Sequence, residues 1–547
     1  MKAEGHNLDT QTLNLLRQTS QFFSAHNRQA YLTGGSLRNL LLGEPCSDWD
    51  IVTDGNVPQL ARSLADKLAG YYVHLNDKAS RIVIKHAGSE TTIDIAPLKG
   101  NTIEEDLRQR DFTINAIAVP LAEIIHLLQI GKVVPFIDDR GELIDPHSHE
   151  TTPGRGQAPP LLYSGFAPRN LMPIGEVLID PLNGLADIQA RQLKAVDDTI
   201  FKHDPLRMLR AIRLSMRYQL SIEPGTENLV KRDAKLLPLA APERIHDELY
   251  AILEPDGATS QLRHLDTLGL LTVLIPEFIL ARGMRQPSPH YWDVLEHSLE
   301  SVGALERLAG MIQRGGSHDV YSDDFAELRA LLLEAEQRGI FQFASLTAPR
   351  MKLAALLHDI GKPITYSTGA DGNIHFYDHP QAGIPLAQQI MTRLNARTQD
   401  RRVVQLVVAH HMRPGQLGNL DTVTPRAIRR YFVDLGPMGI HVALFSLADH
   451  IATVGPLWDE YTKRPDSSWP RHLSLVRLLL IRYIRERESI LPARLVSPEE
   501  LMRRLKLEPG PLIGHLLESI AEAQAEGRIH SKEEALWLAE EEIQGRN

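Results

Sequence analysis

Cysteine is nearly absent from the sequence, because Cys46 is the only one in 547 residues. A single cysteine excludes an internal disulfide and a zinc site made of cysteines. The N-terminal residues lack the apolar core of a signal peptide, and no apolar run reaches the roughly 18 residues that a membrane span needs. These absences predict a cytoplasmic protein.

An excess of positive charge is also missing. The formal net charge is −10, although 23% of the residues are charged. This balance excludes a uniformly basic surface, so any contact with nucleic acid must come from local arginine clusters. The length exceeds what a single core supports and predicts about three to four domains.

Residues 33–57 combine a glycine pair with two spaced aspartates. Gly34 and Gly35 lie between a predicted strand at 31–33 and a leucine-rich segment that is predicted to be a helix, so a phosphate can approach their backbone. Asp48 and Asp50 alternate along a second predicted strand and therefore share one face. Their charges repel unless a cation lies between them, which indicates Mg²⁺ ions holding a triphosphate. The alternative is a tight turn followed by two solvated residues.

The pattern GG-x-x-R-x-x-x-L-G, followed by D-x-D, resembles the nucleotidyltransferase motif of the class II tRNA nucleotidyltransferase and poly(A) polymerase family. The resemblance implies a polymerase-beta-like palm that extends an RNA 3′ end without a template. It also implies that Asp48 and Asp50 are catalytic metal ligands and that Arg38 belongs to the nucleotide site. Asn39 stands where the family usually has aspartate.

Residues 101–119 hold a second motif. Thr102 and Glu105 form a capping box, and the run 104–119 is predicted to be a helix. Arg108, Arg110, Asp111 and Asn115 resemble the family motif RRDFTINA, with Gln109 in place of an arginine, which implies contacts with the incoming nucleotide. The alternative is a surface ion pair. Upstream, Asp94 is interpreted as a structural residue at a strand end, with a third acidic site residue as the alternative.

Residues 203–218 are predicted to form a helix with Asp204 as its N-cap and Pro205 as its first residue. Arginines recur on one face of this helix, and an apolar stripe lies on another. The segment resembles the family's nucleotide-selection motif, with His203 replacing a glutamate. The resemblance implies that Asp204 and Arg207 read the base of CTP or ATP and that Arg210 binds the nucleotide. Further along, Glu243, Arg244 and Glu248 match a family motif that supports the selection helix.

Histidines and aspartates recur through the second half of the chain, in the order of the HD phosphohydrolase superfamily. Imidazole and carboxylate ligands suit a divalent ion such as Mn, Ni or Fe. Each histidine taken alone is more commonly an ordinary residue, and a fused HD domain can also be inactive. The candidate ligands are His297, His358, Asp359, His379, His410, His411 and Asp449.

The predicted fold class is α+β multidomain, with a palm followed by all-α domains. The predicted domains are an N-terminal helix at 1–30, a palm at 31–200 with a Pro/Gly-rich insertion at about 146–177, a helical neck at 201–285, an HD domain at 286–455 and a C-terminal helical domain at 456–547 that is a candidate for RNA binding.

The resemblance implies an enzyme that adds C and/or A to the 3′ end of tRNA, using CTP, ATP and Mg²⁺. It does not separate CCA addition from CC addition or poly(A) synthesis. Two other classes remain open: an HD phosphohydrolase with a degenerate palm, which the changes at Asn39, Gln109 and His203 favour, and a non-catalytic RNA-binding protein. The presence of Asp48, Asp50, Asp204 and Arg207 favours the nucleotidyltransferase.

Overall fold

The computed structural model describes residues 10–75, 79–86, 89–129, 177–315, 322–370, 372–420 and 422–544. Except for its last residue, the insertion predicted at 146–177 lies outside these ranges. The chain divides into two compact units, Met1–Leu236 and Leu237–Asn547.

The first unit is built on a six-stranded sheet with the order β3-β4-β5-β2-β1-β6. Strands β2 and β5 run parallel, whereas the other neighbours run antiparallel. The strands predicted around residues 31–33 and 48–52 are confirmed as β1 and β2. The bounds are β1 Ala30–Thr33, β2 Asp48–Thr53, β3 Tyr71–His74, β4 Ser80–His86, β5 Ser89–Pro97 and β6 Ala118–Pro120.

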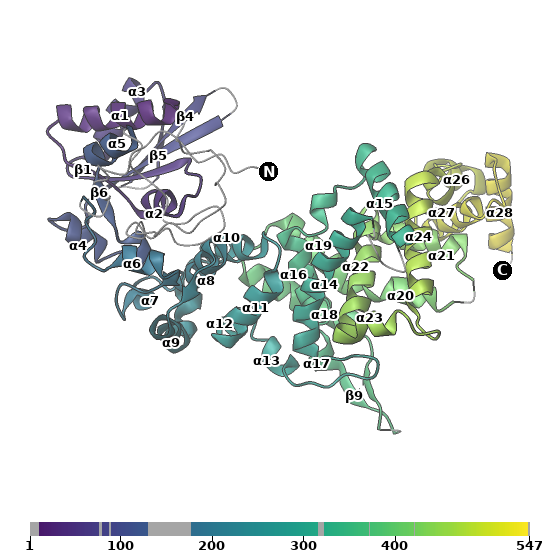
Figure 1. Ribbon diagram of the computed structural model, residues 1–547. Coiled ribbons are helices and arrows are strands. Elements are labelled where there is room, and N and C mark those ends of the chain that lie inside the picture. Colours follow the sequence, from purple (N-terminus) through teal and green to yellow (C-terminus); the bar gives the residue numbers. More distant parts are fainter. Residues whose placement is uncertain are drawn as a thin grey trace, which may run out of the picture. The chain divides into compact units, whose positions relative to one another are not determined.

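Helices cover both sides of this sheet (Figure 1). Helices α3 (Val57–Lys67) and α5 (Leu121–Gln129) contact its strands, and α1 (Thr10–Ala25) contacts α5. The predicted helix after the glycine pair is α2 (Gly34–Leu42), which ends at Gly43 in the left-handed conformation that glycine favours. The remaining elements of the unit are α4 Ile103–Leu107, α6 Gly184–Gln189, β7 Gln192–Leu193, α7 Ile200–His203, α8 Arg207–Tyr218, β8 Ser221–Ile222 and α9 Pro224–Asp233.

The helix predicted over 104–119 is wrong beyond its first turn. Thr102 caps α4 by accepting the Glu105 N–H, as the capping box predicts, but the helix ends at Leu107. The backbone then bonds to a distant segment, because the Thr113 N–H donates to the Lys194 carbonyl at 2.9 Å. Tertiary pairing therefore overrides the helical pattern, and only a short 3₁₀ turn, Thr113–Asn115, follows.

The predicted start of the arginine helix is also wrong. Asp204 ends α7 with an extended backbone, and α8 begins at Arg207. The Asp204 carbonyl accepts the Arg207 N–H at 3.1 Å, and its carboxylate accepts the Leu206 N–H at 3.2 Å. Asp204 thus closes a turn between two helices instead of capping α8.

The second unit is mainly helical. One short hairpin, β9 Tyr366–Thr368 with β10 Ile374–Phe376, interrupts its described helices. They are α10 Pro242–Leu253, α11 Ala258–Thr267, α12 Leu270–Leu274, α13 Phe278–Ala281, α14 Val294–Arg314, α15 Ser322–Gln337, α16 Pro349–Leu357, α17 Lys362–Thr365, α18 His379–Arg393, α19 Thr398–His410, α20 Met412–Gly418, α21 Pro425–Leu435, α22 Met438–Val454, α23 Trp458–Tyr461, α24 Trp469–Arg485, α25 Arg487–Ile490, α26 Pro498–Leu505, α27 Pro511–Ala525 and α28 Lys532–Gln544.

Helix α22 forms the centre of this unit. It contacts α14, α19 and α24, and nearly all its apolar side chains are buried. Among the described residues, one segment, 438–461, is long and apolar enough to cross a membrane, and 61% of its apolar window is buried inside the protein. Its apolar character is therefore explained by core packing. The last helices, α26 to α28, share a separate hydrophobic cluster that includes Leu501, Leu516 and Ala535.

Candidate active sites

The paired aspartates lie at the start of β2, in the middle of the sheet. Asp50 stands directly opposite Asp94 on the parallel strand β5, and Asp48 stands opposite Thr92, whose hydroxyl donates to it. Burial raises the pKa of Asp50, and the nearby Asp94 charge adds to the rise. Asp94 lies within β5 and not at its end, and it accepts two hydrogen bonds of 2.7 Å from Arg81.

The glycine pair brings the first turn of α2 against Asp50. A Cβ atom on Gly34, whose φ is +65°, would lie 3.2 Å from Asp50 Oδ2 and 3.0 Å from Arg110 Nη1. A side chain there would be both strained and crowded. The Ser36 N–H donates to Asp50 Oδ2 at 3.1 Å, and the Asp50 N–H donates to Ser36 Oγ at 3.0 Å. The Gly34–Gly35 turn, the Asp50 carboxylate and the Arg110 guanidinium therefore lie against one another.

The second motif supplies the cation. Arg110 is held by Asp106, which accepts from its Nε at 3.0 Å and from its Nη2 at 2.8 Å. This leaves Nη1 directed at the glycine turn, where it would meet a Cβ on Gly34. Asp106 was not predicted from the sequence, although its spacing of four residues from Arg110 is a usable signal.

Asp111 and Asn115 connect this motif to α8. Asp111 Oδ1 accepts from the Asn115 side chain at 2.9 Å, and its Oδ2 accepts from Arg210 at 3.1 Å. Burial alone would raise the pKa of Asp111, but the Arg210 charge and the hydrogen bonds from Asn115 and the Phe112 N–H lower it. Asn115 also accepts a 2.6 Å hydrogen bond from Arg38. The structure thus brings Arg38, Arg110, Asp111, Asn115 and Arg210 together around the turn.

Arg207, at the start of α8, donates to the carbonyls of Gln109 and Arg110, both at 3.3 Å. Asp204 lies three residues before it, in the turn described above. Arg108 is exposed at the end of α4 and is not part of the buried network. Glu243, Arg244 and Glu248 lie on α10 in the second unit, and only Glu248 is buried.

A second cluster lies at the centre of the second unit. His297 on α14, His358 and Asp359 after α16, and Asp449 on α22 form one group. Asp359 Oδ2 is 3.1 Å from His358 Nε2 and 3.4 Å from His297 Nε2, and Asp449 Oδ1 is 3.0 Å from His297 Nε2. The ligand atoms of His297, His358 and Asp359 lie within 4.8 Å of one another, which suits a metal ion, and Asp449 adjoins them.

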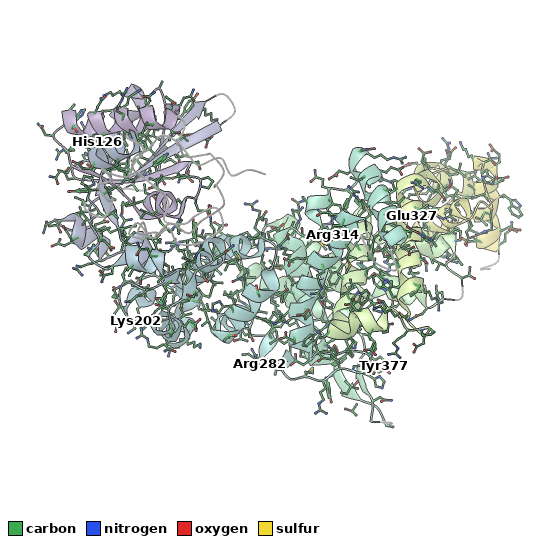
Figure 2. The ribbon with its side chains drawn as sticks, in the orientation of Figure 1. His126, Lys202, Arg282, Arg314, Glu327 and Tyr377 are labelled. Atoms are coloured by element: carbon green, nitrogen blue, oxygen red, sulfur yellow. The ribbon has the colours of Figure 1, made fainter. Side chains whose placement is uncertain are left out.

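The other oxygen of Asp359 faces a second group. Its Oδ1 is 3.2 Å from His379 Nε2 and 3.5 Å from His411 Nε2, and these two nitrogens are 3.2 Å apart. His410 does not join either group; it is half-buried beside a pocket of about 600 Å³ that Tyr377 and Arg413 also line. Tyr377 is exposed near the β9–β10 hairpin (Figure 2).

The residues of this cluster fit a divalent ion. Asp359 Oδ2 and Asp449 Oδ1 are buried and face the His297 and His358 rings, and the Lys362 ammonium lies 2.5 Å from Asp359 Oδ2. Burial alone would lower the pKa of His358, but Asp359 and Asp449 raise it to about 10. Lys362 supplies one positive charge beside Asp359, and a bound metal would supply further positive charge between the two carboxylates. Three of the four rings are also oriented from behind, since the His358, His379 and His411 Nδ1 atoms lie 2.8, 2.9 and 3.0 Å from backbone carbonyls.

A pocket of about 320 Å³ opens beside this cluster. His411 and Asp449 belong to its lining, which also carries hydroxyl, amide, imidazole and guanidinium groups. His290, another lining residue, was not predicted from the sequence; its ring stacks edge-on against His297 with centroids 5.4 Å apart. The remaining polar wall residues include Gln416, Asn419, Ser446, His450, Tyr461, Arg471 and His472.

Comparison with protein families agrees with this geometry. Residues 30–134 match the poly A polymerase head domain, residues 219–280 match the probable RNA and SrmB-binding site of polymerase A, and residues 294–453 match the HD domain. The first match contains the aspartates and glycines of the sheet, and the third contains all the clustered histidines.

Relatives align over most of the chain. The A-adding tRNA nucleotidyltransferase of Deinococcus radiodurans is 29% identical over 513 residues, which cover 92% of this chain and 94% of that protein. The CC-adding tRNA nucleotidyltransferase of Thermus thermophilus is 28% identical, with 93% and 92% covered. The multifunctional CCA protein of Teredinibacter turnerae is 26% identical over 70% of this chain and 74% of its own length.

Solved structures share the fold. A CCA-adding enzyme in complex with CTP superposes with a TM-score of 0.58 at 20% identity, covering 98% of this chain and 96% of its own. The Thermotoga maritima CCA-adding enzyme complexed with tRNA has a TM-score of 0.53 at 21% identity, with 98% and 97% covered. The predicted α+β multidomain fold is confirmed. The chain therefore carries the poly A polymerase head domain, the RNA-binding segment of that polymerase and an HD domain, and it is similar over most of its length to tRNA nucleotidyltransferases.

Proposed function

We propose that this protein is a template-independent, metal-dependent nucleotidyltransferase that adds C and/or A to the 3′ end of tRNA in the cytoplasm. The observation that carries the proposal is the convergence of Asp48, Asp50, the Gly34–Gly35 turn and Arg110 at the centre of the sheet. Relatives that align over nearly the whole chain include A-adding and CC-adding tRNA nucleotidyltransferases, which supports tRNA, CTP and ATP as partners.

Asp48 and Asp50 would hold Mg²⁺, because carboxylates on one face of a strand suit this ion and the raised pKa of Asp50 indicates a charge that a cation would stabilise. Bound Mg²⁺ would supply charge neutralisation for the triphosphate and activation of the RNA hydroxyl. The glycine turn lets phosphates approach the backbone, and Arg110 adds positive charge above it. Asp48 is exposed, so an RNA end can reach this side of the site.

The remaining candidate residues of the nucleotide site have different proposed roles according to where they lie. Asp204 and Arg207 lie at the turn before α8 and would read the base edge, since carboxylate and guanidinium groups have fixed hydrogen-bond geometry. Arg38, Asp111, Asn115 and Arg210 form the buried network behind them, and exposed Arg108 would add charge at the rim. The proposed supporting residues are Glu243, Arg244 and Glu248. We retain the domain boundaries given above, including RNA contacts by the C-terminal helices, as part of the proposal.

The test offers the purified protein tRNAs that end before C, after CC and after CCA, together with an unrelated RNA, with each nucleoside triphosphate supplied separately. We expect incorporation of C, A or both into the incomplete tRNAs only. Equal extension of the unrelated RNA with A would identify a poly(A) polymerase instead. No incorporation into any substrate would overturn the proposal.

A second function is favoured by the histidine cluster. We propose that the HD domain hydrolyses phosphoesters, with His297, His358, Asp359 and Asp449 holding one divalent ion and Asp359, His379 and His411 a second. An ion such as Mn, Ni or Fe would supply an activated water at neutral pH.

The adjoining pocket has the volume and polar lining that a nucleotide-sized ligand needs. A 2′,3′-cyclic or terminal phosphate on a damaged tRNA end would leave the free hydroxyl that the palm requires. The check is hydrolysis of such ends together with metal analysis of the protein; absence of both would make the domain structural.

A further inference from the structure

Tyr218 occupies an unusual position at the end of α8. Its side chain is 5% exposed, and its hydroxyl lies between two residues of α2 that are far away in sequence. The hydroxyl accepts a hydrogen bond from Arg38 Nη2 at 2.6 Å and donates to Asn39 Oδ1 at 2.9 Å. The Arg38 guanidinium carbon also lies 4.2 Å from the centre of the Tyr218 ring. One side chain thus holds Arg38 through both its hydroxyl and its ring.

Arg38 itself is 6% exposed, and its hydrogen-bond partners are neutral. They are Asn115, Asn39 and Tyr218, at distances between 2.6 and 3.3 Å. Burial lowers the pKa of Arg38, and Asp111 and Asp50 oppose this only through charge at longer range. A buried cation without a bonded carboxylate is costly unless it serves an anion nearby. A Cβ on Gly35 would lie 3.4 Å from Arg38 Nη2, so the charge lies directly beneath the proposed phosphate turn.

Helix α8 is fixed to the palm at both of its ends. Near its start, Arg207 holds the carbonyls of Gln109 and Arg110, and Arg210 holds Asp111. At its last residue, Tyr218 holds Arg38 and Asn39. The candidate base-reading residues at the start of α8 are therefore linked, through one rigid helix, to the cation beneath the glycine turn.

We propose that Tyr218 is a positioning residue of the nucleotide site, which holds the buried Arg38 charge beneath the Gly34–Gly35 turn and fixes α8 relative to that turn. The proposal rests on the nucleotidyltransferase function proposed above. Asn39 belongs to the same hydrogen-bond network. Its amide oxygen accepts hydrogen bonds from Arg38 and Tyr218 but does not neutralise the guanidinium, so the full charge of Arg38 acts on the triphosphate.

The test compares Tyr218→Phe with wild type. Calorimetry measures the Kd for CTP and ATP with Mg²⁺ in the absence of RNA, and extension assays measure KM and kcat. We expect Kd and KM for both nucleotides to rise about tenfold, the factor that one hydrogen bond to a charged group represents, while kcat changes much less. Tyr31→Phe is the matched control, because the Tyr31 hydroxyl bonds Gln29 at the surface, outside the network.

A purely structural role for Tyr218 would lower Tm and the active fraction but leave Kd and KM unchanged, and that result would overturn the proposal. Asn39→Asp provides a second variant that does not depend on the folding of the first. Its carboxylate would pair with Arg38, so nucleotide affinity should fall equally for CTP and ATP, most strongly at low salt. Unchanged affinity in Asn39→Asp would contradict the role given to the Arg38 charge.

These measurements separate the two proposals. If wild type binds nucleotides but extends no RNA, the nucleotidyltransferase function fails, and the comparison of Kd values still decides the role of Tyr218.

Discussion

Single carboxylates in the first unit differ sharply in what surrounds them. Asp50 accepts backbone N–H groups and lies beside Asp94, so burial raises its pKa although Arg110 opposes the rise. Asp111 meets Arg210 and Asn115, and its pKa is lowered. The first environment disfavours the charge in the folded protein and the second favours it. We therefore expect opposite consequences when each side chain is neutralised.

Asp48→Asn and Asp50→Asn should reduce nucleotide incorporation by more than about 100-fold, since even groups that merely support a metal ligand are worth 10- to 100-fold. The fold should persist, because Asp50→Asn removes a charge that burial disfavours. Extension assays and thermal unfolding measure the two effects. Asp66→Asn, at an exposed position of α3, is the control. Wild-type incorporation by either folded variant would contradict the assignment of the metal ligands.

Asp111→Asn should loosen the segment around residues 109–115. A carboxylate with a lowered pKa stabilises the folded state above its unfolded pKa of about 3.9, and this contribution is lost as pH falls through the folded value. Near neutral pH the variant should therefore lose about 1–3 kcal/mol of local stability. Near pH 3 the difference should shrink. Hydrogen exchange of the peptide that contains residue 111 measures the local stability at each pH. An equal loss of stability near neutral pH and near pH 3 would argue against an ionised Asp111–Arg210 pair.

Helix α8 gathers most of the arginines that the first site uses, and its two faces explain why. Met208, Leu209 and Ile212 are buried on one side, so the arginines on the other side face the palm or solvent. The helix thus places Arg207 and Arg210 one turn apart along the same edge of the nucleotide site.

Arg207→Ala should relax the choice among nucleoside triphosphates more than it weakens triphosphate binding, because the phosphates meet the glycine turn and Arg110 instead. We expect discrimination against UTP and GTP to fall by about tenfold or more, the worth of one charged hydrogen bond. Competition assays with all four nucleotides measure this. Lys231→Ala, an exposed change on α9, is the control. Unaltered discrimination would place base selection elsewhere.

Elements with a strong local pattern could be predicted from the sequence, whereas those stabilised by distant partners could not. The strand of Asp48 and Asp50 and the helix after Gly35 follow from alternation and from leucine spacing. The segment after Leu107 has the same helical pattern, but its backbone bonds near Lys194. Tyr218 is separated from Arg38 by 180 residues, so no local signal could join them. The motif resemblance identified candidate residues of the two sites, whereas Asp106, His290 and Tyr218 could be identified only from the folded structure.

At the scale of the whole molecule, the two clusters of chemistry lie in separate compact units. Each is built from its own elements, the first on a sheet and the second among helices α14, α16, α18, α19 and α22. No residue of the described chain belongs to both clusters. Damage to one cluster should therefore leave the chemistry of the other unaffected.

The double variant His358→Ala with Asp359→Ala should lose bound transition metal and any phosphoester hydrolysis while it still adds nucleotides. Removing one carboxylate and one imidazole takes away ligands of both histidine groups. Elemental analysis, hydrolysis assays and extension assays are run on the same preparation. His515→Ala, at a half-exposed histidine of α27, is the control. Loss of nucleotide addition in a folded double variant would show that the two units depend on each other.

Asp359 has a consequence for how the protein would take up metal. Its two oxygens face different histidine groups, so both ions would share the charge of Asp359, and only the group with His297 and His358 has a second carboxylate, Asp449. An ion bound at one group reduces the negative potential that the other group offers, and the two cations repel each other at short range. Loading should therefore be anticooperative. We expect purified protein to retain its first ion tightly, release a second readily, and yield metal contents between one and two ions per chain that depend on the free metal in the buffer.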